Sequence, residues 1–336
     1  MLTELDYLPD GFLHTEAAEL HTIFPGPTLI HLPGRRDNPL FVSILLHGNE
    51  DTGLKAMQTV LKKYQNTPLP RALSLFIGNV EAARHGVRRM DNQLDYNRVW
   101  SSDDDANTPE HRMTRKVIKT MMQRGVFASI DIHNNSGLNP HYACITRLDE
   151  NFLHLAAMFS RIAVYFTSPK SVQCEAFAHL CPAVTLECGK PGGVSGVEHA
   201  AAFVEGALHL SNFPTHPVAR HDLDLYQSIA VVTVPDTVSL SVGSGSADLC
   251  LEENIDHYNF RELEPGTRLG VVSSGNPMPL CARNEIDQDI SADYFEVKAG
   301  GLITRRPVMP AMLTRNTQII RQDCLCYLME RLERKY

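Results

Sequence analysis

Hydrophobic residues in the first two thirds of the chain follow two spacings, one typical of buried strands and one typical of amphipathic helices. The nearly continuous apolar run at 39–46 predicts a strand covered on both faces. Apolar residues three and four apart then predict a helix over 51–64. The same patterns predict further strands at 72–77, 126–132 and 183–186, and further helices at 109–124, 150–165 and 197–210. This alternation indicates an α/β fold with a mostly parallel or mixed sheet flanked by helices.

The pattern changes after Asn212, where two prolines indicate a linker. Short β-branched runs at 229–234 and 238–242, and turns such as Ser274-Gly275, predict a smaller, mainly antiparallel β domain. We therefore expect two domains, one over 1–215 and one over 218–336.

Two further segments complete the picture from the pattern alone. Apolar residues from Ile319 to Leu332 predict a closing helix over 317–335. The acidic run 103–105 predicts a solvated loop.

Composition narrows the class of protein. The 336 residues are 43% hydrophobic and 21% charged, as in ordinary globular proteins. A formal net charge of -8 argues against nucleic acid or an anionic membrane as a partner. No apolar stretch has the length of a membrane span, and the first residues lack the pattern of a secretory signal, so we expect a cytoplasmic protein. The sequence leaves open whether the chain forms a homo-oligomer.

The eight cysteines are scattered along the chain without CxxC pairs. This spacing predicts neither a disulfide framework nor a structural zinc knuckle. We expect the thiols to be reduced or buried.

Polar residues with chemical capability follow four of the predicted strands. These are His47 to Glu50 after the first, Asn79 after the second, Asp131 to Asn134 at the end of the third and Glu187 at the end of the fourth. In open α/β sheets the ligand crevice lies outside the carboxyl ends of the strands. We therefore expect these groups to meet in one cleft.

A metal site is the chemistry that this set favours. His47 and Glu50 are three residues apart at a strand-to-helix turn, with Gly48 permitting a tight backbone path. Catalytic zinc sites use three protein ligands and leave one position for water, and two His with one Glu is an established set. His133 is the natural third ligand. An HxxE motif alone is weak, and only the position of these residues at strand ends favours one bound Zn²⁺ ion over a surface histidine.

Glu187 and the segment 88–98 provide candidates for the remaining roles. A carboxylate near the cleft floor that does not bind the metal has the chemistry of a general base, although Glu187 alone would more simply be a salt-bridged or helix-capping residue. Arginine holds carboxylates with a planar fork and stabilises oxyanions, which makes Arg88, Arg89 and Arg98 candidates. Asn97 is a candidate neutral donor, and Asn134, next to His133, is a further candidate for substrate binding.

In sum these residues resemble those of the succinylglutamate desuccinylase/aspartoacylase family, relatives of the M14 zinc carboxypeptidases. The matching pieces cover about the first 200 residues and occur in the family's order: HGNE (47–50), Asn79 with Ala82 and Ala83, an Arg upstream of DYNR (95–98), DIHN (131–134) and LECG (186–189). No single piece is specific, but the set is.

The resemblance implies a carboxypeptidase-like catalytic domain that cleaves an acyl group from an amino acid. It implies His47, Glu50 and His133 as zinc ligands and Glu187 as general base. It also implies that Asn97 and Arg98 hold the substrate carboxylate or carbonyl, helped by Arg88 or Arg89. The family's C-terminal β domain, which narrows access to the site, would correspond to about 218–336.

The chain departs from the family pattern in two places. DYNR stands where the family usually has DLNR, and the spacing back to the arginine is one residue longer, which leaves the choice between Arg88 and Arg89 open. The segment 133–143 is unusually polar for the acylase members, so that His141 or Tyr142 is a candidate to line the substrate pocket.

Three functions are compatible with the residues. The leading one is zinc-dependent hydrolysis of an amide in a small substrate that bears a carboxylate. The second is an M14-type metallocarboxypeptidase or amidase that acts on short peptides. The third is a non-catalytic, metal-containing binding module, against which Glu187 argues because such a module has no need of a base. GxSxG, GxxxxGK[ST] and strand-linked GxGxxG motifs are absent from the sequence.

Overall fold

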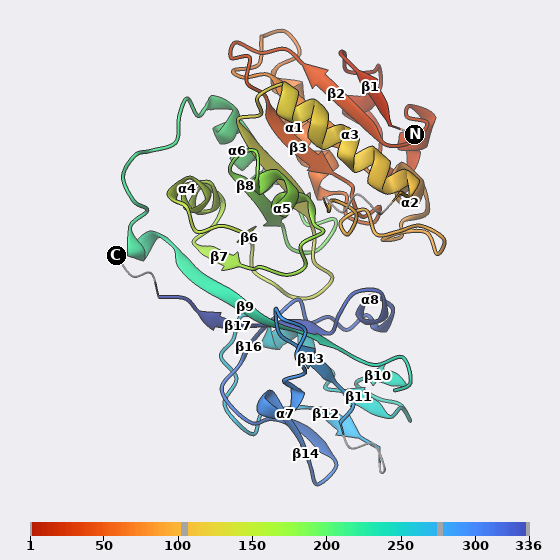
Figure 1. Ribbon diagram of the computed structural model, residues 1–336. Coiled ribbons are helices and arrows are strands. Elements are labelled where there is room, and N and C mark those ends of the chain that lie inside the picture. The colour runs from red at the N-terminus through yellow and green to blue at the C-terminus, as the bar shows by residue number, and fades with distance from the viewer. Residues whose placement is uncertain (1, 102–106, 274–277, 334–336) are drawn as a thin grey trace. The chain divides into compact units, whose positions relative to one another are not determined.

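The computed structural model describes residues 2–101, 107–273 and 278–333. The chain forms two compact units, one of residues 1–134 and 141–224, the other of 135–140 and 225–336 (Figure 1). The chain passes from the larger unit to the smaller at 134–135 and at 224–225, and returns between them at 140–141. The domains expected from the sequence were 1–215 and 218–336. The acidic run 103–105 and the turn at Ser274-Gly275 lie outside the described residues.

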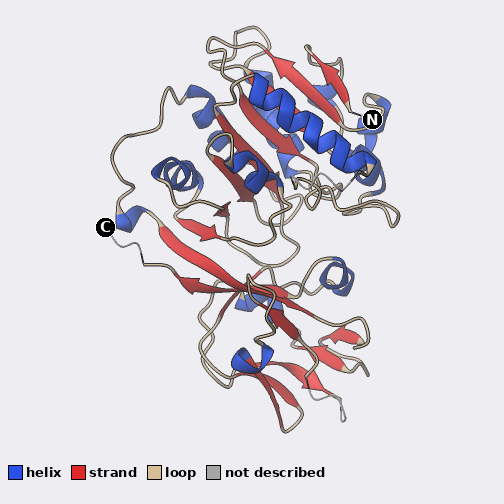
Figure 2. Cartoon of the chain, in the orientation of Figure 1, coloured by secondary structure: helices blue, strands red, loops and turns tan. Residues whose placement is uncertain are grey.

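The larger unit is built on a mixed sheet with helices on its sides (Figure 2). Its strands run in the order β1 (Thr3–Leu5), β2 (Thr28–Leu32), β4 (Leu73–Ile77), β3 (Leu40–Ile44), β5 (Ala128–His133), β8 (Ala183–Glu187), β6 (Tyr142–Ile145) and β7 (Ile162–Tyr165). The four central strands β4, β3, β5 and β8 are parallel, while β2 and β6 pair antiparallel with their central neighbours. The predicted fold class is therefore confirmed.

The central strands carry continuous apolar runs because they are covered on both faces. Every residue of β3, β4, β5 and β8 is buried. The parallel arrangement brings the carboxyl ends of these four strands to the same edge of the sheet. That edge holds the polar residues discussed below.

Six helices of the described chain belong to this unit. They are α1 (Thr52–Lys63), α2 (Val80–His85), α3 (Pro109–Gln123), α4 (Glu150–Phe159), α5 (Gln173–Ala178) and α6 (Val194–His209). Short 3₁₀ turns occur at Phe12–His14, Ala17–Thr22 and Arg220–Asp222. Helix α1 packs against α6, and α6 packs against α4.

The predicted start of the helix at 109 is confirmed by its cap. Thr108 is extended and its hydroxyl accepts a hydrogen bond from the His111 N–H, with Pro109 at the first helical position. Asn79 caps α2 in the same way, because its Oδ1 accepts from the Ala82 N–H at 3.0 Å.

The helix predicted over 150–165 is confirmed up to Phe159 and wrong beyond it. Helix α4 ends at Phe159, Ser160 is extended, and residues from Ile162 form β7, which pairs parallel with β6. The Ser160 hydroxyl donates to the His141 carbonyl at 2.8 Å and accepts from the Ile162 N–H at 3.0 Å. These bonds and the pairing with β6 outweigh the helical spacing of the apolar residues.

The smaller unit contains two sets of strands. β9 (Asp224–Thr233) pairs antiparallel with β17 (Cys326–Arg331) and β13 (Cys281–Arg283), and β17 pairs antiparallel with β16 (Met309–Ala311). The separate sheet has the order β10 (Leu240–Val242), β11 (Leu249–Leu251), β12 (Arg268–Val272), β15 (Gly301–Thr304) and β14 (Phe295–Lys298). All its pairs are antiparallel except β10 with β11. Its helical segments are short: Ile255–Tyr258, α7 (Ser291–Tyr294) and α8 (Thr317–Gln322).

The closing helix predicted over 317–335 is wrong. Helix α8 ends at Gln322, and β17 follows at Cys326–Arg331 between β9 and β16. The Leu325 N–H donates to the Val232 carbonyl at 2.8 Å and begins this pairing. Apolar spacing in this segment suits either structure, and the hydrogen bonds offered by two neighbouring strands decide in favour of a strand.

Among the described helices none combines the length and the apolar character needed to cross a bilayer.

Candidate metal centre

The loop between β3 and α1 places His47 and Glu50 at the carboxyl edge of the central strands. Leu45 adopts a left-handed backbone conformation with φ 54°, which turns the chain away from the strand direction. Gly48 lies against the backbone of α2, where a Cβ atom would be 2.2 Å from the Ala83 nitrogen. Only glycine permits this approach, which holds the loop between the sheet and α2.

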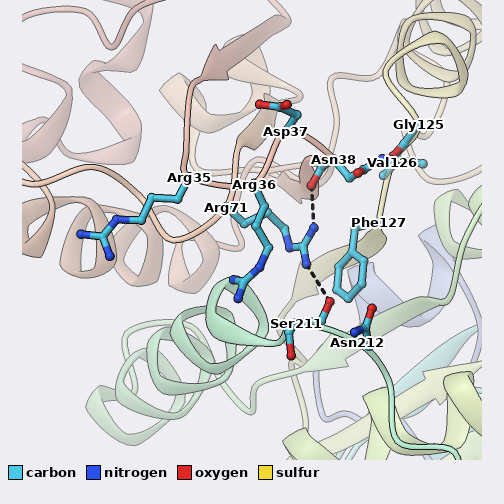
Figure 3. Close-up of a pocket in the computed structure, with 10 residues that line it drawn as sticks. All are labelled: Arg35, Arg36, Asp37, Asn38, Arg71, Gly125, Val126, Phe127, Ser211 and Asn212. Atoms are coloured by element: carbon cyan, nitrogen blue, oxygen red, sulfur yellow. Dashed lines mark hydrogen bonds between the residues drawn. The ribbon is translucent and has the colours of Figure 1, made fainter.

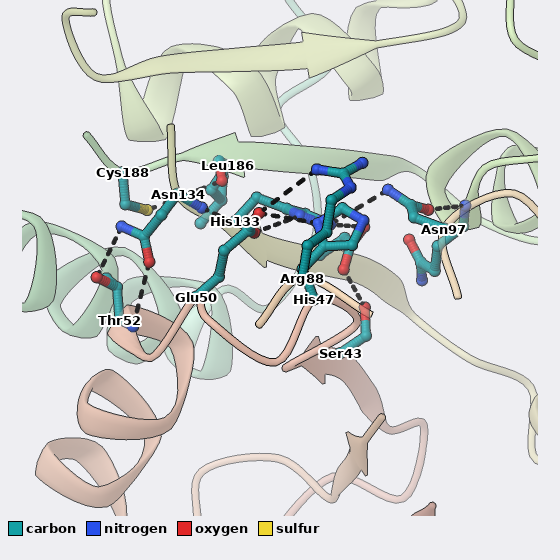
Figure 4. Close-up of polar contacts among 12 residues, drawn as sticks. Ser43, His47, Glu50, Thr52, Arg88, Asn97, His133, Asn134, Leu186 and Cys188 are labelled. Carbon is teal, nitrogen blue, oxygen red and sulfur yellow. Dashed lines mark hydrogen bonds and ion pairs between the residues drawn. The ribbon is translucent and has the colours of Figure 1, made fainter. Parts of the chain in front are cut away.

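Glu50 joins the two histidines that the sequence predicted as ligands (Figure 4). Its Oε1 lies 2.9 Å from His47 Nδ1, and its Oε2 lies 2.8 Å from His133 Nδ1. The candidate ligand atoms of the three residues are all within 4.8 Å of one another, and all three residues are buried. Two imidazoles and one carboxylate converging from two strand ends have the donor atoms and spacing of a metal-binding group.

The outer nitrogen of each imidazole faces a second carboxylate. His47 Nε2 lies 3.0 Å from Asp95 Oδ1, and His133 Nε2 lies 2.7 Å from Asp131 Oδ2. An outer N–H that donates to a carboxylate leaves the inner Nδ1 with its lone pair for a cation. The carboxylates therefore orient both rings with Nδ1 toward Glu50.

The pKa values in this cluster reflect its charges. Burial would raise the pKa of Glu50, but the neighbouring His47 and His133 outweigh it and hold that pKa far below its ordinary value. Burial would lower the pKa of His133, but Asp131 and Glu50 raise it well above the usual value for histidine. The lowered pKa of Glu50 and the raised pKa of His133 both mean that the cluster stabilises positive charge among its carboxylates. A site for a divalent cation requires this property.

Arg88 reaches this cluster. Its Nε and Nη2 donate to Asp95 Oδ2 at 3.1 and 3.0 Å, and its Nη1 lies 3.9 Å from Glu50 Oε1. Arg89 instead donates from Nη1 to the Gln93 carbonyl at 3.1 Å. The sequence left open whether Arg88 or Arg89 reaches the site, and by position it is Arg88 that lies near the cluster.

Asp95 connects Arg88 to His47. Burial would raise its pKa, but His47 and Arg88 lower that pKa well below the ordinary value, so Asp95 is ionised. A single carboxylate thus orients a predicted metal ligand and a predicted substrate-binding arginine.

Asn97 lies beside the outer edge of His133. Its Nδ2 is 3.2 Å from His133 Nε2, and its Oδ1 accepts from the Gln173 N–H at 2.9 Å. Arg98 is partly exposed and donates from Nη1 to the Asn97 carbonyl at 2.9 Å. Both predicted residues are therefore near the cluster, with Asn97 buried and Arg98 at its margin.

Asn134 is engaged on both sides of its side-chain amide. Its Nδ2 donates to Thr52 Oγ1 and to the Gly189 carbonyl, both at 2.8 Å, and its Oδ1 accepts from the Thr52 N–H at 3.3 Å. Its backbone N–H donates to Glu50 Oε2 at 3.1 Å. Asn134 thus connects the start of α1, the candidate ligand Glu50 and the loop after β8.

Glu187 is the last residue of β8 and is in register with His133 of the adjacent parallel strand. Residues paired in this way direct their side chains to the same face of the sheet. Burial raises the pKa of Glu187 to about 8, with Glu50 and Asp131 adding to the increase and His133 and Arg88 opposing it. Glu187 is therefore a buried carboxyl group that changes protonation near neutral pH in this environment.

Asp131 and Asp95, which contact the two histidines, were given no role in the sequence analysis, although both residues belong to the motifs quoted there. Asp131 is two residues before His133 on one strand, and the strand period of two predicts that their side chains share a face. The contact between Asp131 and His133 could therefore have been predicted from the sequence. Asp95 lies in the irregular segment between α2 and α3, where no periodicity indicates its approach to His47.

Comparison with known proteins places these observations in a family. The sequence model of the succinylglutamate desuccinylase/aspartoacylase catalytic domain matches residues 39–213, which include every residue of the cluster. A search of curated protein sequences gave no match.

Solved structures of this family have the same fold at low sequence identity. Succinylglutamate desuccinylase from Vibrio parahaemolyticus is similar with a TM-score of 0.58 and 12% identity, covering 90% of this chain and 83% of that one. Murine aminoacylase 3 gives a TM-score of 0.57 and 14% identity, with 89% and 96% covered. Succinylglutamate desuccinylase from Chromobacterium violaceum gives 0.53 and 18%, with 82% and 86% covered.

The family match spans more than half of the chain and contains the His47, Glu50 and His133 cluster. The chain therefore belongs to the succinylglutamate desuccinylase/aspartoacylase family of amide hydrolases.

Proposed function

We propose that this protein is a zinc-dependent deacylase that cleaves the amide bond of a small N-acyl amino acid bearing a free carboxylate. The observation that carries the proposal is that a candidate metal-binding group and a separate carboxyl group lie at the same end of the central strands. Two buried imidazoles meet one carboxylate at 2.8 and 2.9 Å, and Glu187 stands beside them, in register with His133. A metal-binding group with an adjacent carboxyl group is the arrangement that metal-assisted hydrolysis needs.

His47, Glu50 and His133 are the residues that would hold one Zn²⁺ ion. Their donor set of two nitrogens and one carboxylate suits zinc, whose catalytic sites use three protein ligands. When bound, zinc polarises a carbonyl and lowers the pKa of its water to about 7. Asp95 and Asp131 keep both imidazoles oriented for this role.

Glu187 acts as the general base in this proposal. Its burial and its raised pKa of about 8 make Glu187 ready to exchange a proton near neutral pH. The positive charge of a bound ion would lower that pKa and favour the carboxylate form. The carboxylate takes a proton from the attacking water, and the resulting acid returns it to the leaving nitrogen.

The substrate carboxylate or the developing oxyanion is held by Arg98 and Arg88, with Asn97 as a neutral donor. Arg98 is partly exposed at the margin of the cluster, and Arg88 carries positive charge to within 3.9 Å of Glu50. A protein of net charge -8 needs such local cations to attract an anionic substrate. For Asn134 we propose a positioning role in place of substrate contact, because its amide already bonds to Thr52 and Gly189.

The substrate class is tested by assaying the zinc-loaded protein on N-succinylglutamate, N-acetylaspartate and other N-acyl amino acids beside short peptides. We expect turnover of at least one N-acyl amino acid that carries a side-chain carboxylate and little turnover of peptides. Turnover of peptides alone would replace the proposal with a carboxypeptidase or amidase. Zinc binding without turnover of either class would favour a non-catalytic module.

A further inference from the structure

A pocket of about 500 Å³ is shown in Figure 3 with the residues that line it. By the positions of these residues in the sequence, it lies at the ends of the central strands opposite to the metal centre. Its walls come from residues just before β3, β4 and β5 and from residues just after α6, among them Arg36, Asn38, Arg71, Phe127, Ser211 and Asn212. The five residues of β3 separate this pocket from the loop that carries His47, a distance of about 17 Å. The pocket is therefore distinct from the candidate active site.

Arg71 carries a buried positive charge in this pocket. It is 2% exposed, its Nη1 donates to the Asn38 carbonyl at 2.9 Å, and its Nη2 donates to the Leu210 carbonyl at 2.8 Å. Its guanidinium also stacks 3.6 Å over the Phe127 ring. Within the described residues its contacts are all to neutral groups and its Nε has no hydrogen-bond partner. The charge of Arg71 is therefore not neutralised by a neighbouring carboxylate.

Arg36 adds a second positive charge on a well-held backbone. Its carbonyl accepts from the Ala72 N–H at 2.8 Å, and the adjacent Arg35 N–H donates to the Leu69 carbonyl at 2.9 Å. Gly34 permits this close approach, because a Cβ there would lie 2.1 Å from the Arg71 carbonyl carbon. The two arginines are thus brought together by backbone pairing, before any ligand is present.

The two charges act on one another and are not balanced within the pocket. Burial and the positive charge of Arg36 lower the pKa of Arg71 below its ordinary value. The Arg36 side chain has no hydrogen bond or ion pair within the described part of the chain. Asp37 also lines the pocket, but its carboxylate is directed away from the Arg36 and Arg71 guanidinium groups (Figure 3). Arg36 is exposed, and its backbone is held beside that of Arg71. Two like charges on neighbouring backbone segments favour a ligand of the opposite sign.

We propose that this pocket binds a phosphate group, either as inorganic phosphate or as part of a small phosphate ester. Arg36 supplies the direct charge-assisted hydrogen bonds, because its planar fork matches phosphate oxygens. Arg71 holds the walls together and contributes positive potential. Ser211 and Asn212 also line the pocket, and their side chains can act as neutral donors. The pocket volume leaves room for an organic group beyond the phosphate.

The test is calorimetric titration of the full chain with inorganic phosphate at constant ionic strength. We expect saturable binding to the wild type and at least a tenfold weaker affinity for Arg36→Ala, the loss typical of one charge-assisted contact. Arg84→Ala, which removes an exposed arginine on α2 outside the pocket, is the matched control and should bind as the wild type does. If Arg36→Ala melts at a lower temperature without phosphate, Arg36→Gln gives the same comparison with a longer side chain.

Two further arms separate the sources and the sites. A phosphate monoester such as glycerol phosphate that binds more tightly than inorganic phosphate would identify an ester as the ligand, and equal affinity would identify the free ion. Arg88→Ala should keep the binding that depends on Arg36, because Arg88 belongs to the other end of the strands. Equal phosphate affinity in wild type and the Arg36 variants, or binding weaker than about 10 mM in the wild type, would overturn the proposal.

Discussion

Asp131 and His133 are alternate residues of β5, and Asp131 Oδ2 lies 2.7 Å from His133 Nε2. The other oxygen of Asp131 accepts a hydrogen bond from the Ser43 hydroxyl at 2.7 Å, so the carboxylate is held from two sides. With a metal ion bound, this contact would keep the proton of His133 on Nε2 and leave Nδ1 for the ion.

Replacing Asp131 by Asn should therefore weaken metal binding. The Asn Oδ1 can still accept from Ser43, which leaves an NH₂ group facing His133 Nε2. That group stabilises the tautomer protonated on Nδ1, the nitrogen that faces Glu50. We expect zinc affinity to fall by roughly 10- to 100-fold. Competition with a chelator measures it, and an unchanged affinity in a variant with wild-type circular dichroism would contradict the orienting role.

Glu187→Gln should separate metal binding from catalysis. Glutamine keeps the shape of the side chain but has no carboxylate to accept a proton. We expect one zinc ion per chain and a decrease in kcat of about 10²-fold or more. Metal analysis and steady-state kinetics on the best N-acyl amino acid check both parts. Wild-type kcat in this variant would remove Glu187 from the mechanism.

The two neighbouring arginines should behave differently. Arg88 bonds to Asp95 inside the cluster, whereas Arg89 bonds to the Gln93 carbonyl. Arg88→Ala should lower kcat/KM by at least tenfold, since it removes a charged group near the substrate and a partner of Asp95. Arg89→Ala is the matched control and should change kcat/KM less than threefold, about 0.6 kcal/mol. A larger effect at Arg89 would reverse the assignment.

His31 predicts a pH dependence of stability outside the active site. Burial first, and then Arg124, lowers its pKa to about 4 in the folded protein, against 6.5 in the unfolded chain. The unfolded chain therefore binds the proton more readily, and the folded state loses stability as pH falls from about 6.5 toward 4. His31→Gln should lose less stability between pH 7 and pH 5 in urea unfolding than the wild type. His21→Gln, at an exposed histidine, is the control, and equal pH dependence in all three proteins would refute the prediction.

The parts of the fold that sequence could predict are those where one signal is strong. The apolar run at 39–46 and the Thr108-Pro109 cap have only one plausible structure, and both were located to within a few residues. The segments 160–165 and 323–331 have apolar spacing that suits helix or strand. Their structure depends on partners such as β6 and β9, which lie far away in the sequence.

The same distinction applies to the site. His47, Glu50 and His133 were identifiable because each follows a predicted strand, and parallel strands bring their ends together. The contacts of Asp95 with His47 and Arg88 could not be predicted, because they depend on the path of an irregular segment. Asn134 was predicted to bind substrate from its place next to His133, and its amide contacts with Thr52 and Gly189 could not be inferred from that place alone.

The most direct test of the account is the metal content of the purified protein together with the X-ray absorption spectrum of the bound ion. The account predicts one zinc per chain, coordinated by two imidazole nitrogens and carboxylate or water oxygens, with zinc and hydrolysis both lost in His47→Ala and in His133→Ala. A protein that hydrolyses N-acyl amino acids at full rate after complete removal of metal, or that keeps its zinc in both histidine variants, would contradict it.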